Sequence, residues 1–108
     1  MPDFRYSAVV ARWVDGDTVD VVIDLGFKVH TKQRLRLYGV NTPERGQPGF
    51  DEATAYARDR APEGSVVEVQ TYKTGKYGRW LAMVYVHGEA QSINRGLVEE
   101  KLAVEYLP

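Results

Sequence analysis

Five short segments of the sequence either alternate between apolar and polar residues or run apolar, and turn residues separate them. Alternation is typical of a β-strand, because successive side chains point to opposite faces of a sheet. Helical periodicity is limited to two further stretches. We therefore expect strands at residues 6–14, 19–25, 28–38, 65–72 and 80–86, and helices at residues 50–61 and 93–101.

The order of these elements, three strands, a helix, two strands and a second helix, predicts a small barrel. Asp15-Gly16 lies between the first two apolar runs and is a strong hairpin signal. Gly26 marks the turn into the third strand, so the first three strands form an antiparallel meander. Closing a sheet into a barrel removes its exposed edges. We expect an α+β fold that is mostly β: an OB-type barrel of five short antiparallel strands, with a helix after the third strand and a short C-terminal helix.

Composition limits the classes of protein to which the chain can belong. Its 108 residues fit one domain spanning residues 1–108. The absence of cysteine excludes disulfides and thiolate zinc sites. No export signal or long apolar run is present, so we expect a soluble, cytoplasmic chain with no membrane partner. The formal net charge of -1 argues against a large basic surface for nucleic acid, and the oligomeric state is left open.

The segment at residues 34–44 combines a strand with a rigid corner. Leu35 and Leu37 share one face of the strand and Arg36 lies on the other, so one face is core and the other is cationic. A proline fixes the backbone just before Glu44, and this carboxylate is therefore expected next to Arg36. An acid and a cation presented together form a candidate catalytic site.

Three motifs, in order and spacing, resemble the signatures of the staphylococcal nuclease (thermonuclease) family. They are Val14-Asp15-Gly16-Asp17-Thr18-Val19, Arg36-Leu37 through Asn41-Thr42-Pro43-Glu44, and Lys76-Tyr77-Gly78-Arg79 before an apolar strand. The resemblance covers nearly the whole chain and implies the same five-stranded OB barrel. It also implies a further C-terminal helix, which this sequence, ending at Tyr106-Leu107-Pro108, does not contain.

The resemblance implies a calcium-dependent nuclease that acts on DNA and RNA with one bound Ca²⁺. Asp17 matches a calcium ligand of the family, and the backbone carbonyl of Thr42 would be another. Asn41 stands where the family usually has an aspartate, so its amide oxygen could still bind while one negative charge is lost. Calcium prefers six to eight oxygen ligands, which is consistent with these residue types.

The remaining roles that the resemblance implies concern the phosphodiester itself. Glu44 matches the residue that activates or orients the attacking water. Arg36 and Arg79 would stabilise the charge that develops on the phosphate, because a guanidinium donates two parallel hydrogen bonds to phosphate oxygens. Tyr77 resembles a tyrosine that contacts a neighbouring phosphate, and Lys76 beside it adds positive charge.

Each motif has a second interpretation when it stands alone. Asp-Gly-Asp is also an ordinary hairpin turn, Arg36 could be a solvated strand residue, and Glu44 could be a surface acid. We expect Trp13 and Trp80 to pack the barrel rather than to stack on bases.

Two functions from different classes therefore remain. The first is an active nuclease, which should prefer single strands because the chain has few phosphate contacts and a net charge of -1. The second is a catalytically weak or inactive OB-fold module that binds nucleic acid. The substitution at Asn41 favours the second, and the presence of Asp17, Arg36, Glu44 and Arg79 together favours the first.

Overall fold

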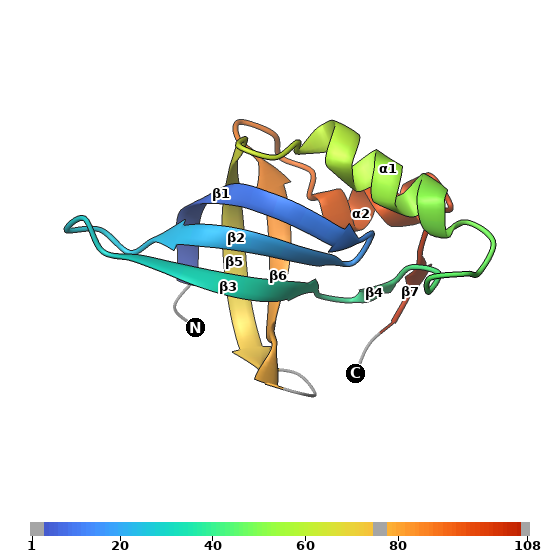
Figure 1. The fold of residues 1–108 in the computed structure, drawn as a ribbon, viewed down its shortest axis with the longest axis horizontal. Coiled ribbons are helices and arrows are strands. Elements are labelled where there is room, and N and C mark those ends of the chain that lie inside the picture. Colours follow the sequence, from blue (N-terminus) through green and yellow to red (C-terminus); the bar gives the residue numbers. More distant parts are fainter. Residues whose placement is uncertain (1–3, 75–77, 107–108) are drawn as a thin grey trace.

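In the computed structural model, which describes residues 4–74 and 78–106, five long strands close into a barrel (Figure 1). Around the barrel the strands follow the order β1-β2-β3-β6-β5. The predicted OB-type α+β fold is confirmed. The strands are β1 (Phe4–Asp15), β2 (Thr18–Asp24), β3 (His30–Leu37), β5 (Val66–Thr74) and β6 (Trp80–Val86).

Two helices lie side by side at one end of the barrel (Figure 1). The first, α1 (Phe50–Arg60), follows the third strand as expected and contacts β1, and the second, α2 (Ile93–Glu99), contacts β6. Both end slightly earlier than the sequence pattern predicts. The second ends before Lys101, whose φ of 60° is a left-handed conformation incompatible with a continuing α-helix. Neither described helix has the length and apolarity needed to cross a membrane.

The expectation that all five strands are antiparallel is wrong at one place, where the barrel closes. There β3 and β6 run parallel, with Leu35 opposite Trp80 and Arg36 opposite Leu81. The other four pairings are antiparallel. The reason is geometric, because directions cannot alternate all the way around a ring with an odd number of strands. One parallel seam is therefore unavoidable.

A second, two-stranded sheet was not expected from the sequence. It joins β4 (Val40–Asn41) to β7 (Val104–Glu105), and beyond it the Tyr106 amide donates to the Gly39 carbonyl at 2.8 Å. Two-residue strands are too short to show an alternating pattern, so only the long-range pairing identifies them. This sheet brings the end of the chain to the end of β3.

The core fills the barrel and the space under the two helices. Trp13 is 3% exposed, and its indole nitrogen donates to the Ala61 carbonyl at 2.9 Å, which fastens β1 to the end of α1. The expectation that this tryptophan packs the interior is therefore confirmed. Trp80, in contrast, is 39% exposed at the start of β6. The largest fully buried side chains are Leu35, Leu37, Leu97, Val10, Val19, Val21, Val67, Val69 and Val84.

A buried amide on α2 fastens the helix to the barrel seam. The Asn94 side chain is 2% exposed; its oxygen accepts from the Val84 amide at 3.1 Å. Its nitrogen donates to the carbonyls of Tyr38 at 2.9 Å and Ala82 at 3.1 Å. One side chain thus links α2, β6 and the end of β3. A buried polar network that is fully satisfied fixes a unique arrangement of the elements it joins.

We predict that Asn94→Ala lowers the free energy of unfolding by about 3 kcal/mol, because the buried Val84 amide loses its acceptor and two further bonds disappear. Urea denaturation measures this change. Gln91→Ala is the matched control, since this amide is exposed and bonds only to Glu99 within the described residues. It should cost less than about 0.5 kcal/mol. Equal losses in the two variants would show that Asn94 does not fasten the seam.

Candidate active site

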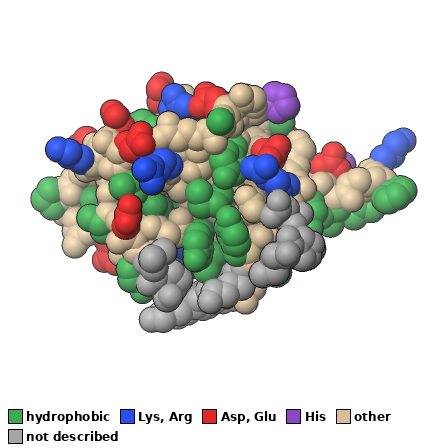
Figure 2. Space-filling view, turned by 180° about the vertical axis from the view of Figure 1, so that it is seen from behind, with side chains coloured by type: hydrophobic (Ala, Val, Ile, Leu, Met, Phe, Trp, Pro, Cys, Tyr) green, Lys and Arg blue, Asp and Glu red, His purple; other side chains and the backbone are tan. Residues whose placement is uncertain are grey.

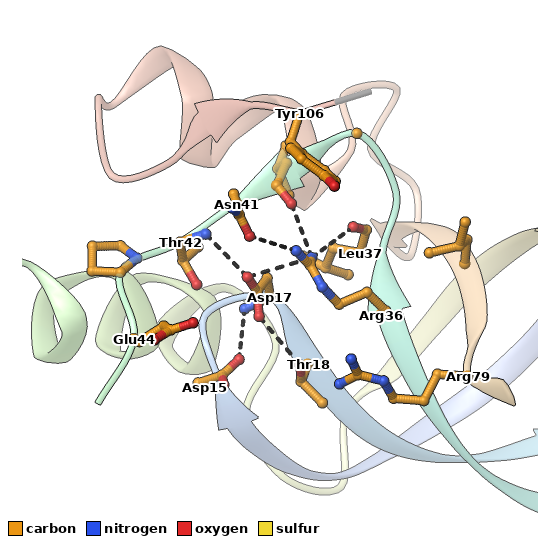
Figure 3. Close-up of a pocket in the computed structure, with 14 residues that line it drawn as sticks. Asp15, Asp17, Thr18, Arg36, Leu37, Asn41, Thr42, Glu44, Arg79 and Tyr106 are labelled. Carbon is orange, nitrogen blue, oxygen red and sulfur yellow. Dashed lines mark hydrogen bonds and ion pairs between the residues drawn. The ribbon is translucent and has the colours of Figure 1, made fainter. Parts of the chain in front are cut away.

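A cavity of about 460 Å³ opens on the outer wall of the barrel beside the parallel seam (Figure 3). The β1–β2 turn, the end of β3, the segment after β4, the start of β6 and the residue after β7 form its walls. Its lining is Asp15, Asp17, Thr18, Arg36, Leu37, Gly39, Val40, Asn41, Thr42, Pro43, Glu44, Arg79, Leu81 and Tyr106.

Most of the residues that the sequence singled out meet in this one cavity. Lys76 and Tyr77, the predicted substrate contacts, lie outside the described residues. The six that the structure brings together are Asp17, Arg36, Asn41, Thr42, Glu44 and Arg79.

Asp17 lies at the centre of the site and joins three segments of the chain. One carboxylate oxygen accepts from the Thr42 amide at 3.0 Å and lies 3.4 Å from the Arg36 guanidinium. The other accepts from the Thr18 hydroxyl at 3.2 Å, and the Asp17 carbonyl accepts from the Leu37 amide at 2.8 Å. Burial alone would raise the pKa of Asp17, but hydrogen bonds and the nearby arginine outweigh it and lower that pKa. Asp17 is therefore ionised at neutral pH.

The turn that carries Asp17 depends on the small size of Gly16. Gly16 and Asp17 form the turn itself, and β2 begins at Thr18, one residue earlier than expected, so Asp17 lies directly before the returning strand. Gly16 does not have a positive φ. Instead, a Cβ there would lie 2.9 Å from the Cβ of Ala53 and 3.0 Å from the Cγ2 of Thr42. The glycine is needed for close approach of the turn to α1.

Arg36 is held by three acceptors on its own side of the cavity. Its Nη1 donates to the carbonyls of Leu37 at 3.0 Å and Val40 at 2.9 Å, and its Nη2 donates to Asn41 Oδ1 at 2.7 Å. Within the described part of the chain these bonds leave the Nε hydrogen and one Nη2 hydrogen available. The guanidinium is thus fixed in position while two of its five donors can still reach a phosphate oxygen.

Asp15 and Glu44 lie on one side of the cavity and the two arginines on the other, with Asp17 between them and 3.4 Å from the Arg36 guanidinium. Figure 3 shows the carboxylates of Asp15, Asp17 and Glu44 turned toward one another, with Arg36 and Arg79 on the other side. Glu44 is exposed, and two hydrogen bonds with Gln47 hold its backbone in a turn. The Glu44 amide donates to the Gln47 side-chain oxygen at 2.8 Å, and the Glu44 carbonyl accepts from the Gln47 amide at 2.9 Å. A phosphodiester placed between the two sides would meet a base and two guanidinium groups.

Two residues of the cavity were not identified from the sequence. Asp15 was named only within the hairpin signal and the first family motif and was given no role, although the Asp-Gly-Asp spacing could have indicated a paired acid. Its pKa is raised to about 6 by burial, and by the hydrogen bonding and negative charge of Asp17. Tyr106 is 47% exposed and reaches the cavity only through the β4–β7 sheet, for which no motif gives a signal.

The oxygen groups of the cavity match a hard divalent cation in chemical type. The carboxylates of Asp15, Asp17 and Glu44 are all oxygen donors, and the Thr42 hydroxyl is buried without a hydrogen-bond partner among the described residues. These residues do not, however, form a cluster of three acids close enough to hold a metal by themselves, as far as the described residues extend. Backbone and water oxygens would have to complete the coordination. Asn41 Oδ1 is engaged by Arg36, as described above.

We predict that Gly16→Ala destabilises the protein by roughly 1–3 kcal/mol, because the new methyl group meets the backbone and Cβ of Ala53 and the Cγ2 of Thr42. The partner variant Ala53→Gly removes the closest contact and should itself cost about 1 kcal/mol of helix stability. The double variant should lose clearly less than the sum of the two single changes in chemical denaturation. Strictly additive losses would show that Gly16 is not required for this contact.

The comparisons with known proteins agree with this geometry. The family model described as staphylococcal nuclease homologue matches residues 34–107, about two thirds of the chain. Protein ParB of Escherichia coli is 33% identical over 106 residues, which cover 90% of this chain and 55% of ParB, so the chain spans about half the length of that relative. The range that the family model matches contains the positions of Arg36, Glu44 and Arg79. The chain belongs to the staphylococcal nuclease family.

Proposed function

We propose that this chain is a metal-dependent nuclease that hydrolyses phosphodiester bonds of DNA and RNA at the cavity beside the β3–β6 seam. The observation that carries the proposal is the separation of charge within one cavity, with Asp15, Asp17 and Glu44 facing Arg36 and Arg79. Membership of the family supports a nuclease-like or nucleic-acid-binding domain and does not choose between them.

In the proposed reaction the arginines bind the phosphate. Arg36 is already oriented by Leu37, Val40 and Asn41, so little side-chain entropy is lost when its remaining donors meet a phosphate oxygen. Arg79 enters the same cavity from the start of β6. As negative charge builds on the non-bridging oxygens, donors that are fixed in advance stabilise the transition state more than the ground state.

Glu44 is the proposed base. Its side chain is exposed on the rim and turned into the cavity, so a water molecule can reach it from solvent (Figure 3). A carboxylate in that position accepts a proton from water, or orients it, as the water attacks phosphorus on the side opposite the leaving oxygen. Asp17 is less suited to this task, because its carboxylate is held by hydrogen bonds from Thr42 and Thr18.

One calcium ion is the proposed cofactor, with Asp17, Asn41 and the carbonyl of Thr42 as ligands. Asp15 would add the negative charge that an asparagine at position 41 does not supply. When bound, the ion would compensate charge on the phosphate. It would also relieve the repulsion between Asp15 and Asp17 that raises the pKa of Asp15.

The alternative, a catalytically weak module that binds nucleic acid, is favoured by one specific contact. Asn41 Oδ1 accepts from Arg36 at 2.7 Å, so the residue that replaces an expected acid supports the phosphate-binding arginine instead of presenting its oxygen to a cation. In that case the cavity would hold a phosphate without cleaving the strand. Both functions use the same fold, and the next two experiments separate them.

We predict that the purified chain cleaves a single-stranded DNA or RNA oligonucleotide in calcium and not in chelator, and cleaves a matched blunt duplex more slowly. A divalent ion is needed to compensate phosphate charge, and a net charge of -1 gives little affinity for a rigid duplex. Asn41→Asp should lower the calcium concentration needed for half-maximal cleavage. Full cleavage in chelator would exclude the cation, and binding without cleavage in every cation would favour the alternative.

We predict that Arg36→Ala slows cleavage on the order of 100- to 1000-fold at saturating substrate, since a donor to the transition state is lost. Arg34→Ala is the matched control: it lies two residues away on the same strand face, exposed and paired with Asp20 at 2.7 Å, outside the cavity. Its rate should remain near that of the parent. Glu44→Gln should lower kcat with little change in substrate affinity. A parental rate in folded Arg36→Ala would remove this arginine from the mechanism.

A further inference from the structure

A second cavity lies at the other end of the barrel strands from the helices. Its volume is about 230 Å³, and all five barrel strands contribute side chains to it. Three of these are aromatic: Tyr6 from β1, Tyr72 from β5 and Trp80 from β6. Tyr72 is 43% exposed and Trp80 39% exposed, so both present ring surface to solvent. The Tyr72 ring also lies 4.9 Å from the Tyr38 ring, which helps to hold it in place.

A polar edge faces these rings. Gln33 on β3 lines the cavity, and its Nε2 donates to the hydroxyl of Thr31 at 3.1 Å. That bond orients the amide and uses one of its two hydrogens. Among the described residues, the Gln33 oxygen and the second Nε2 hydrogen remain side by side as an acceptor and a donor. An aliphatic ligand would leave both of them unpaired, whereas a planar heterocycle with a donor and an acceptor on one edge would satisfy both.

We propose that this cavity is a nucleobase-binding pocket that takes one unpaired base, with adenine preferred. Aromatic side chains stack on the faces of bases of any sequence. A glutamine amide pairs in particular with the N6 donor and N7 acceptor of adenine. The aromatic side chains of the cavity would therefore stack on any base, and the Gln33 amide would favour adenine.

The pocket and the proposed active site lie on opposite sides of the same seam. Trp80 directly follows Arg79 in the chain and is opposite Leu35, and the next pair along the seam is Arg36 with Leu81. A strand that binds its phosphate at Arg36 and Arg79 can therefore turn a neighbouring base around the start of β6 into the pocket. This role rests on the proposed function. It gives a second reason for preferring single strands, because a paired base would first have to leave its stack.

The chain contains its own reporter for the test. Trp13 is 3% exposed, so a ligand in the pocket changes the fluorescence of Trp80, the other of the two tryptophans. Adenosine, which has no phosphate, should quench this emission in a saturable way, and cytidine should do so with at least threefold weaker affinity. Ribose 5-phosphate, which has no base, should have no effect. No saturable response to adenosine in the folded parent would overturn the proposal.

Two variants test the polar edge. Gln33→Leu should weaken adenosine binding roughly 5- to 150-fold, which corresponds to the about 1–3 kcal/mol of a good bidentate pair, and should leave cytidine binding unchanged. Thr31→Val keeps the shape of Thr31 but releases the glutamine amide, and should give a smaller loss in the same direction. Both should retain the parental circular dichroism spectrum. Equal losses for adenosine and cytidine in Gln33→Leu would contradict selection by the amide.

Further measurements separate this proposal from the nuclease proposal. Arg36→Ala should slow cleavage on the order of 100- to 1000-fold and leave adenosine quenching intact. Gln33→Leu should leave cleavage of bis(p-nitrophenyl) phosphate, which has no base, at the parental rate. If the parent cleaves nothing but adenosine still quenches, the pocket stands without the nuclease.

A different occupant would give a different signal. The β2–β3 hairpin that projects from this end carries hydrophobic side chains toward its tip (Figure 2), including Leu25, Phe27 and Val29, and Phe27 is fully exposed. A second copy could insert this tip into the pocket. Trp80 emission that shifts with protein concentration, is restored by Phe27→Ser and does not respond to adenosine would assign the pocket to that copy and overturn the proposal.

Discussion

The candidate site depends on the hydrogen bonds and the ion pair that the buried Asp17 carboxylate makes. It fixes the amide of Thr42, which follows β4, and faces Arg36 on β3, while its own backbone belongs to the β1–β2 turn. The β1–β2 turn is thereby held against the end of β3 and the segment that follows β4. A buried charge needs such partners, because without them its desolvation would exceed any gain from folding. The contacts of Asp17 with Thr42 and Arg36 thus both position these residues and keep the Asp17 carboxylate ionised.

The barrel seam determines where function can be located. Five strands require one parallel pair, and at that pair the chain enters β6 from a loop that brings Arg79 to one side of the wall and Trp80 to the other. Asn94 closes the same seam from the helical end with three buried hydrogen bonds. The buried Asn94 network and both candidate binding sites therefore all involve residues of β6 or next to it.

The candidate site also contains a repulsive interaction, between the carboxylates of Asp15 and Asp17. Burial, together with the hydrogen bonding and negative charge of Asp17, raises the pKa of Asp15 to about 6, so protonation of Asp15 as the pH falls below about 6 stabilises the folded chain. In the proposed function, a bound divalent cation would relieve the same repulsion at neutral pH. Asn41 limits the repulsion by replacing what would be another carboxylate, and its oxygen supports Arg36. The proposed nuclease activity requires that the acids bind a cation, whereas the alternative requires only that Asn41 keeps Arg36 in place to bind a phosphate.

Alternation and turn residues are local properties of the chain, so they were sufficient to predict the order of strands and helices, the OB class and the proximity of Arg36 to Glu44, while Asp17 was assigned to the site through the family resemblance. Tertiary structure decided what depends on long-range pairing: the parallel seam, the β4–β7 sheet that brings Tyr106 to the cavity, and the role of Gly16. In that last case a residue typical of turns proved to be required for space against α1. Contacts between segments dozens of residues apart leave no periodic pattern in the sequence, so the pattern of each segment alone does not predict which segments will meet.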